Sequence, residues 1–179
     1  ATKAGIIRTE NTFEGMLAKG VDDRCNWHPF KEFLVEGKLP DVSGKLNEHA
    51  LVSRILANRL RLGVGDRFNA IFLKEGDPAK VPNNRRFTIT GIYDSGFEEF
   101  DSQYVFIDIR HIQHMNKWAD YQIGNFEVFL TDFDAIEDKT NEIYGVTVSE
   151  LDTQNIKTKY YRIFEWIGLF DFNVALIIG

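Results

Sequence analysis

The first half of the chain contains short runs in which apolar and polar residues alternate, which is the spacing of half-buried β-strands. Such runs at Lys3–Thr9 and Thr12–Lys19 predict two strands joined by a short turn. Similar runs at Phe87–Tyr93 and Gln103–Ile107 predict two more strands. We therefore expect the region before Ile109 to be rich in strands.

Two segments begin with a capping residue and continue with apolar residues at helical spacing. Ser53 follows a predicted strand at Ala50–Ser53 and is expected to cap a helix that ends near Gly63. Asp108 is expected to cap a second helix. The apolar residues on the buried faces of these helices are Ile55, Leu56 and Leu60 in the first and Ile109, Ile112 and Met115 in the second.

The second half of the chain alternates between strand and helix patterns. Alternating apolar residues at Phe126–Leu130 predict a strand, and Asp132 is expected to cap a helix that stops at Gly145. Val146–Val148 is expected to be a short strand, and a proline-free helix is expected from about Thr153. The pattern as a whole predicts an α+β fold.

The last segment, Trp166–Gly179, is apolar apart from Asp171 and Asn173. Its 14 residues are fewer than the ~20 that a bilayer-spanning helix needs. Hydropathy alone leaves two interpretations open. The segment is either a buried helix of the core or the first part of a transmembrane helix.

Composition excludes several classes of protein. The chain has 179 residues, 44% of them hydrophobic, and 21 basic against 27 acidic side chains give a net charge of −6. This balance argues against binding to nucleic acid through phosphate contacts. The single cysteine, Cys25, cannot form an internal disulfide or a cysteine-based zinc site. No signal-peptide pattern opens the chain.

Candidate catalytic and metal-binding patterns are weak. The Gly63–Asp66 turn lacks the remaining residues of a phosphate-binding loop. His111 and His114 share a helix face with Asp108, but no further metal ligand lies nearby in the sequence. The acidic turn Asp94–Asp101 does not match a calcium-binding loop. We therefore expect no catalytic residue, no metal and no cofactor.

Several segments, taken in order, carry a resemblance to a known family. They are Phe33–Asp41 (FLVEGKLPD), Ala50–Phe68 (ALVSRILANRLRLGVGDRF), Phe87–Ile107 (FTITGIYDSGFEEFDSQYVFI), Thr131–Ile143 and the apolar end from Glu165. In this order and spacing the chain resembles the MacB-like periplasmic core domain of FtsX-like ABC transporter permeases, specifically the lipoprotein-releasing branch.

The resemblance implies two subdomains and a membrane anchor. A discontinuous, βαβ-containing Porter-like subdomain would comprise residues 1–32 and 121–165, and an inserted, strand-rich Sabre-like subdomain would comprise residues 33–120. Residues 166–179 would be the start of a truncated transmembrane helix. The domain would lie on the periplasmic side of the inner membrane and would have no catalytic activity of its own.

The resemblance also implies partners. These are a cytoplasmic ABC ATPase subunit, a second permease subunit that is the same or related, lipoprotein cargo and a periplasmic lipoprotein carrier, but not nucleic acid. Two alternatives stay open: an efflux-type or cell-division permease of the same architecture, and a soluble enzyme or binding protein whose apolar end is part of the core.

One loop takes the position of the β-hairpin hook with which lipoprotein-releasing permeases recruit their carrier. The loop runs from Leu73 to Pro82 and is shorter than that hook. The neighbouring basic pad of the family, an arginine before the loop and Gln-Arg after it, corresponds here to Asn69 and to Asn84–Arg85. A plain hairpin loop is the alternative. The candidate partner-binding residues are Lys74, Pro78, Lys80, Val81, Pro82, Asn84 and Arg85.

Overall fold

The computed structural model describes residues 1–10, 12–73, 81–148, 151–162 and 164–165, which form two compact units, Ala1–Phe126 and Glu127–Gly179. The first unit contains β1 (Thr2–Arg8), β2 (Phe13–Val21), α1 (His28–Phe33), β3 (Leu34–Gly37), β4 (His49–Ser53), α2 (Arg54–Leu60), β5 (Arg67–Phe72), β6 (Asn83–Tyr93), α3 (Glu98–Asp101), β7 (Tyr104–Asp108) and α4 (Ile109–Asn116). The second unit contains α5 (Ile136–Val146) and α6 (Ile156–Lys159). This mixture of one sheet and several helices confirms the predicted α+β fold.

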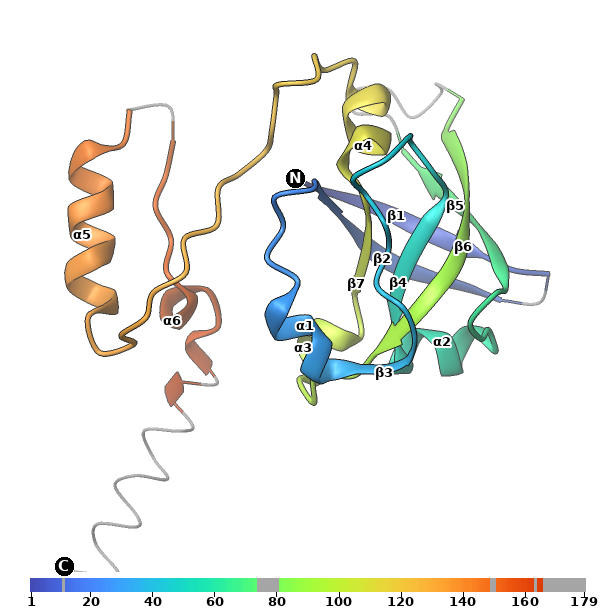
Figure 1. Cartoon of the computed structure of the whole chain (residues 1–179), viewed down its shortest axis with the longest axis horizontal. Coiled ribbons are helices and arrows are strands. Elements are labelled where there is room, and N and C mark those ends of the chain that lie inside the picture. Colours follow the sequence, from blue (N-terminus) through green and yellow to red (C-terminus); the bar gives the residue numbers. More distant parts are fainter. Residues whose placement is uncertain (11, 74–80, 149–150, 163, 166–179) are drawn as a thin grey trace, which may run out of the picture. The chain divides into compact units, whose positions relative to one another are not determined.

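The strands of the first unit form one sheet that closes on itself. Its order is β3-β6-β4-β7-β2-β1-β5, and β5 also pairs with β6. The pairings β2–β7 and β4–β6 are parallel, and the others are antiparallel. Closure directs alternate side chains of each strand into a shared interior. Figure 1 shows the strands curving around one another, with α2 and α4 at opposite ends of the sheet.

Two apolar clusters form the core of the first unit. One fills the interior of the closed sheet and extends to α2 and α4 at its ends. The other lies around Tyr93 and Phe106, against Trp27 and Phe30. Because β4 and β7 separate the two clusters, both faces of these strands are buried. Within the described part of the first unit, the outward-facing residues of β1, β5 and the first part of β6 are exposed or half-buried.

Both capped helices predicted from the sequence are confirmed. The Ser53 hydroxyl accepts a hydrogen bond from the Leu56 N–H at 3.1 Å, and the Asp108 carboxylate accepts one from the Arg110 N–H at 2.9 Å. Ser53 is also the last residue of β4, and Asp108 is the last residue of β7. Each strand therefore continues directly into its helix.

Several expectations for the second half of the chain are wrong. Residues 126–130 form no strand, and the side chain of Phe126 is 76% exposed. Alternating apolar residues stabilise a strand only where a partner edge is available. The helix α5 begins at Ile136, because the Asp132 carboxylate closes a local turn by accepting from the Asp134 N–H at 3.0 Å. Val146 is the last residue of this helix and begins no strand.

The predicted long final helix is interrupted within the described residues. α6 begins after Asn155, whose side chain accepts from the Thr158 N–H at 2.9 Å. It ends at Tyr160, whose backbone (φ −119°, ψ 42°) is not helical. The predicted start of a transmembrane helix at residues 166–179 lies outside the described residues. In the described part of the chain, no helix combines the length and apolarity that crossing a membrane requires.

The predicted Porter-like (1–32 and 121–165) and Sabre-like (33–120) subdomains stay a prediction. The sheet places β1 and β2 beside β5 and β7, so segments from both sides of the boundary at residue 32 share one core. Along the chain, the first compact unit ends at Phe126 and the second begins at Glu127.

Candidate functional site

A row of polar residues crosses the outer face of the sheet. In the strand register Arg8 lies opposite Asn69, and Asn69 lies opposite Arg86. All three residues are exposed. Because neighbouring strands are about 4.8 Å apart, the backbones of Arg8 and Arg86 are separated by roughly 10 Å. Long side chains from both ends of the row can therefore reach one small ligand.

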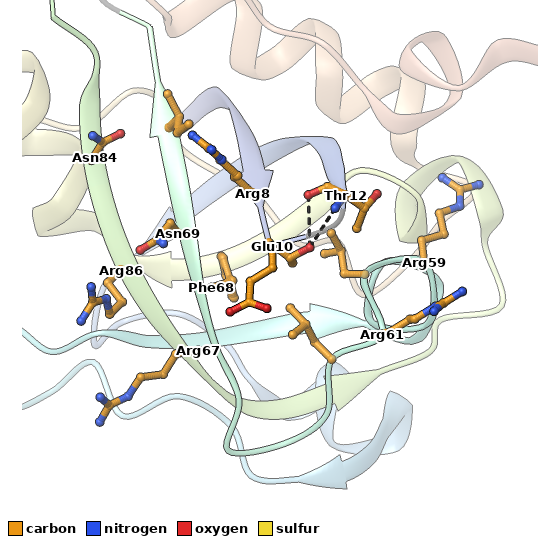
Figure 2. A pocket seen from close by; sticks show the side chains of 14 residues that line it. Arg8, Glu10, Thr12, Arg59, Arg61, Arg67, Phe68, Asn69, Asn84 and Arg86 are labelled. Atoms are coloured by element: carbon orange, nitrogen blue, oxygen red, sulfur yellow. Dashed lines mark hydrogen bonds between the residues drawn. The ribbon is translucent and has the colours of Figure 1, made fainter.

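This row is one wall of a hollow with a volume of about 1130 Å³, which we call the basic groove. In the view of Figure 2, Arg67, Asn69, Asn84 and Arg86 lie on one side, Arg59 and Arg61 lie on the other, and Glu10 lies between them. The charged residues that line the basic groove are Arg8, Arg59, Arg61, Arg67, Arg86 and Glu10. Among the lining residues that the structure describes, five guanidinium groups thus face a single carboxylate, in a chain whose net charge is negative.

The alternation of side chains along β5 determines which residues of this strand line the groove. Phe68 points into the core and is 3% exposed, and Ala70 is fully buried. Successive side chains of a strand point to opposite faces, so Arg67, Asn69 and Ile71 point outward. The apolar residues that stabilise the sheet therefore fix the position of the polar residues that line the groove.

The opposite wall comes from the end of α2 and the turn between β1 and β2. Arg61 ends the helix in the left-handed conformation (φ 56°), and its N–H caps the last helical turn. The β1–β2 turn is closed by a hydrogen bond from the Thr9 N–H to the Thr12 carbonyl at 2.9 Å. Both positions are fixed by backbone hydrogen bonds, so their side chains project from an ordered frame.

Few guanidinium groups of the basic groove pair with a carboxylate of the described residues. A guanidinium nitrogen of Arg59 lies 3.9 Å from the Glu14 carboxylate. Among the described residues, Arg8, Arg61, Arg67 and Arg86 form no ion pair with a carboxylate. Arginine stays protonated at every physiological pH, and its planar donors match phosphate and carboxylate oxygens. The groove is therefore suited to bind an anion.

The predicted partner-binding residues are only partly described. Lys74, Pro78 and Lys80 lie outside the described residues. Val81 and Pro82 are exposed and directly precede β6. Whether this loop binds a partner stays a prediction.

Asn84 and Arg85, the other predicted partner-binding residues, point to opposite faces of β6. Asn84 lines the basic groove, whereas Arg85 pairs with the buried Ala70 and is half-buried. Burial lowers the pKa of His111, and the charge of Arg85 lowers it further. Arg86, which is not among the residues predicted from the sequence, shares the outer face with Asn84. The alternation along β6 could have identified it.

The residues considered for metal binding make other interactions. His111 is buried, and its Nε2 lies 2.6 Å from the Asn47 carbonyl. Asp108 binds the Arg110 guanidinium, which raises the pKa of Arg110. Among the described residues, no three histidine, cysteine, aspartate or glutamate side chains are grouped so that they could hold a metal ion.

Comparisons with known proteins identify the fold. No family model matches the sequence, and no curated protein is significantly similar to it. The extracellular domain of the noncanonic ABC-type transporter YknZ from Gram-positive bacteria is similar in structure, with a TM-score of 0.51 and 12% identity over 87% of this chain and 78% of that chain. A domain described as a permease protein, from Porphyromonas gingivalis, has a TM-score of 0.37 and 17% identity over 84% of this chain and 62% of that chain. The chain thus shares its fold with an extracellular domain of an ABC-type transporter.

Proposed function

We propose that the chain is the extracytoplasmic domain of an ABC transporter permease of the lipoprotein-releasing type. The observation that carries the proposal is the likeness in fold to an extracellular ABC-transporter domain over most of the chain. In this proposal the domain has no catalytic activity and binds no cofactor. A cytoplasmic ABC ATPase subunit supplies the energy, and the full-length protein is anchored in the plasma membrane.

The segments that carry the family resemblance pack against one another, which supports the proposal. Gly37 of the EGKLP turn has a positive φ of 76°, and a Cβ there would collide with the Thr90 carbonyl of the FTITG segment. Gly65 of the VGD turn donates from its N–H to the Ile89 carbonyl at 2.8 Å. Segments distant in the sequence therefore form one structural unit, as expected if they are inherited together.

The membrane anchor is tested with the gene's full-length product. Cells that express it are fractionated, and extracytoplasmic residues are cleaved with protease added to intact spheroplasts. We expect the protein in the membrane fraction, with this domain cleaved from outside. A reading frame that stops at Gly179, together with recovery in the soluble fraction, would favour the soluble binding protein instead.

Lipoprotein release is the finer part of the proposal, with a second permease subunit, lipoprotein cargo and a periplasmic carrier as its partners. Binding of the purified carrier to this domain is measured for the wild type and for Arg85→Glu, with Arg24→Glu as a control outside the hairpin. Carrier binding that Arg85→Glu weakens supports this branch. Absence of binding in all three proteins removes the carrier from the proposal.

An efflux-type or cell-division permease is the second candidate. It is favoured by the short loop between β5 and β6 and by Asn69, which occupies the position of the arginine in the carrier-binding pad. Identification of the extracytoplasmic protein that copurifies with the full-length permease distinguishes the two, because only lipoprotein release requires a soluble lipoprotein carrier.

A further inference from the structure

Apolar side chains lie directly beside the arginine row of the basic groove. Phe13 is opposite Arg8 in the strand register and is 75% exposed. Ile6 pairs with Ile71, one outward-facing position further along both strands, and is 38% exposed. Together with Arg8 and the β1–β2 turn, these three residues line a second hollow of about 370 Å³. Arg8 belongs to both hollows, so the charged and apolar surfaces are continuous.

The charged part of this surface matches a phosphate group. Arg8 and Arg86 flank Asn69, whose side-chain amide is a further donor, and Arg67 is the next outward-facing residue on β5. Arginine binds phosphate through two parallel N–H donors. Among the described residues that line the groove, Glu10 is the one carboxylate, and it opposes the binding of any anion. Its replacement therefore gives a variant for which stronger binding is expected.

From this juxtaposition we propose that the surface binds an anionic phospholipid, with the phosphate on the arginine row and an acyl chain against Ile6, Phe13 and Ile71. A soluble phosphate compound would use the arginines and leave the apolar residues in water. A purely acidic peptide, such as polyglutamate, would likewise leave the exposed aromatic ring beside the arginines without an apolar partner. The proposal rests on the proposed function for access to a membrane, but its test uses the isolated chain.

The test is a titration of the full 179-residue chain with soluble short-chain ligands. Binding is measured from the changes in the NMR chemical shifts of the backbone amides. Three ligands separate the contributions: dihexanoyl phosphatidylglycerol, dihexanoyl phosphatidylcholine with the same chains but a zwitterionic headgroup, and glycerol phosphate without chains. We expect the phosphatidylglycerol to shift the amides of Ile6, Asn69 and Asn84 at the lowest concentration. Equal affinity for glycerol phosphate would overturn the acyl-chain contact, and equal affinity for phosphatidylcholine, which carries the same phosphate beside a cation, would overturn the proposed preference for an anionic lipid.

Variants locate the binding to the groove. Each of Arg8→Gln and Arg86→Gln should weaken phosphatidylglycerol binding about tenfold, because each removes charge-assisted hydrogen bonds. Arg24→Gln, an exposed arginine outside the groove, should leave binding unchanged. Phe13→Ser should weaken binding of the lipid but not of glycerol phosphate, whereas Tyr121→Ser, another exposed aromatic residue, should affect neither.

Glu10→Gln provides a variant with the opposite expected effect. It should strengthen phosphatidylglycerol binding and, because it removes an exposed carboxylate, should leave the fold intact. No change in affinity on Glu10→Gln, Arg8→Gln and Arg86→Gln would overturn the proposal. The proposal would also be overturned if a polyglutamate peptide, but not the lipid, shifted the amides of the groove residues. Because these measurements need no ATPase, a negative result would leave the proposed permease function untouched.

Discussion

Asp101 accepts two hydrogen bonds from Ser95, one from its N–H at 3.0 Å and one from its hydroxyl at 2.6 Å. The aspartate is only 1% exposed, and its backbone carbonyl accepts a further hydrogen bond from the Ser53 hydroxyl. One residue thus closes the acidic turn after β6 and joins it to the start of α2. The acidic turn is therefore a structural feature of the fold.

Disruption of the Asp101–Ser95 hydrogen bonds should destabilise the first unit. We expect Asp101→Ala to lower the free energy of unfolding by about 1–3 kcal/mol, because the Ser95 donors lose a charged acceptor in a buried setting. Ser95→Ala should cost less, since its N–H is kept. Chemical denaturation of both single variants and the double variant gives the coupling energy. If the losses in the free energy of unfolding are additive, the two residues do not act as a pair. Glu99→Gln, at an exposed position of the same turn, is the control.

Ser53→Ala should also be destabilising, by about 1–2 kcal/mol, because Ser53 both caps α2 and donates to Asp101. Ser53→Thr keeps the hydroxyl and should retain most of the stability. Ser102→Ala serves as the matched control, since its hydroxyl makes a long 3.4 Å hydrogen bond at a partly exposed site. Equal unfolding midpoints for Ser53→Ala and Ser102→Ala would refute the capping role.

Gly91 is required by the close approach of two segments. A Cβ at this position would lie 2.5 Å from the Lys38 carbonyl and 3.1 Å from the side chains of Leu34 and Leu51. We expect Gly91→Ala to lower the free energy of unfolding by about 1–3 kcal/mol. Gly15→Ala in β2, where a Cβ would meet nothing within 4 Å, should have no such cost. Thermal unfolding of the two variants compares them directly.

His111 predicts a dependence of stability on pH. Burial lowers its pKa in the folded state, although the Asn47 carbonyl and Asp108 partly oppose the shift. As the pH falls below about 6.5, the histidine of the unfolded chain gains a proton more readily than that of the folded chain. Stability is therefore retained above this pH and lost below it, by at most about 1.4 kcal/mol per pH unit.

The measurement for His111 is denaturant unfolding at pH 7.5, 6.5 and 5.5. His111→Gln should flatten the dependence on pH relative to the wild type, even if its absolute stability is lower. His28→Gln, at an exposed position on α1, should keep the slope of the wild type. An unchanged slope in His111→Gln would assign the dependence on pH to other groups.

The features that the sequence predicted correctly are local ones. The caps at Ser53 and Asp108 depend on hydrogen bonds to residues two or three positions away. The strands β1 and β2 could be predicted from the alternation of apolar and polar residues alone. The basic groove depends on the pairing of β1 with β5, which are distant in the sequence. Nothing near Arg8 indicates that it will lie opposite Asn69. The failed strand at residues 126–130 has the same origin, because a strand requires a partner that local alternation does not specify.

Affinity purification of the full-length gene product from detergent-solubilised membranes tests the central claim most directly. The account predicts that an ABC ATPase subunit copurifies in stoichiometric amount and that the complex hydrolyses ATP, with this domain protected from labels applied on the cytoplasmic side. A product recovered from the soluble fraction, without any ATPase subunit, would contradict it.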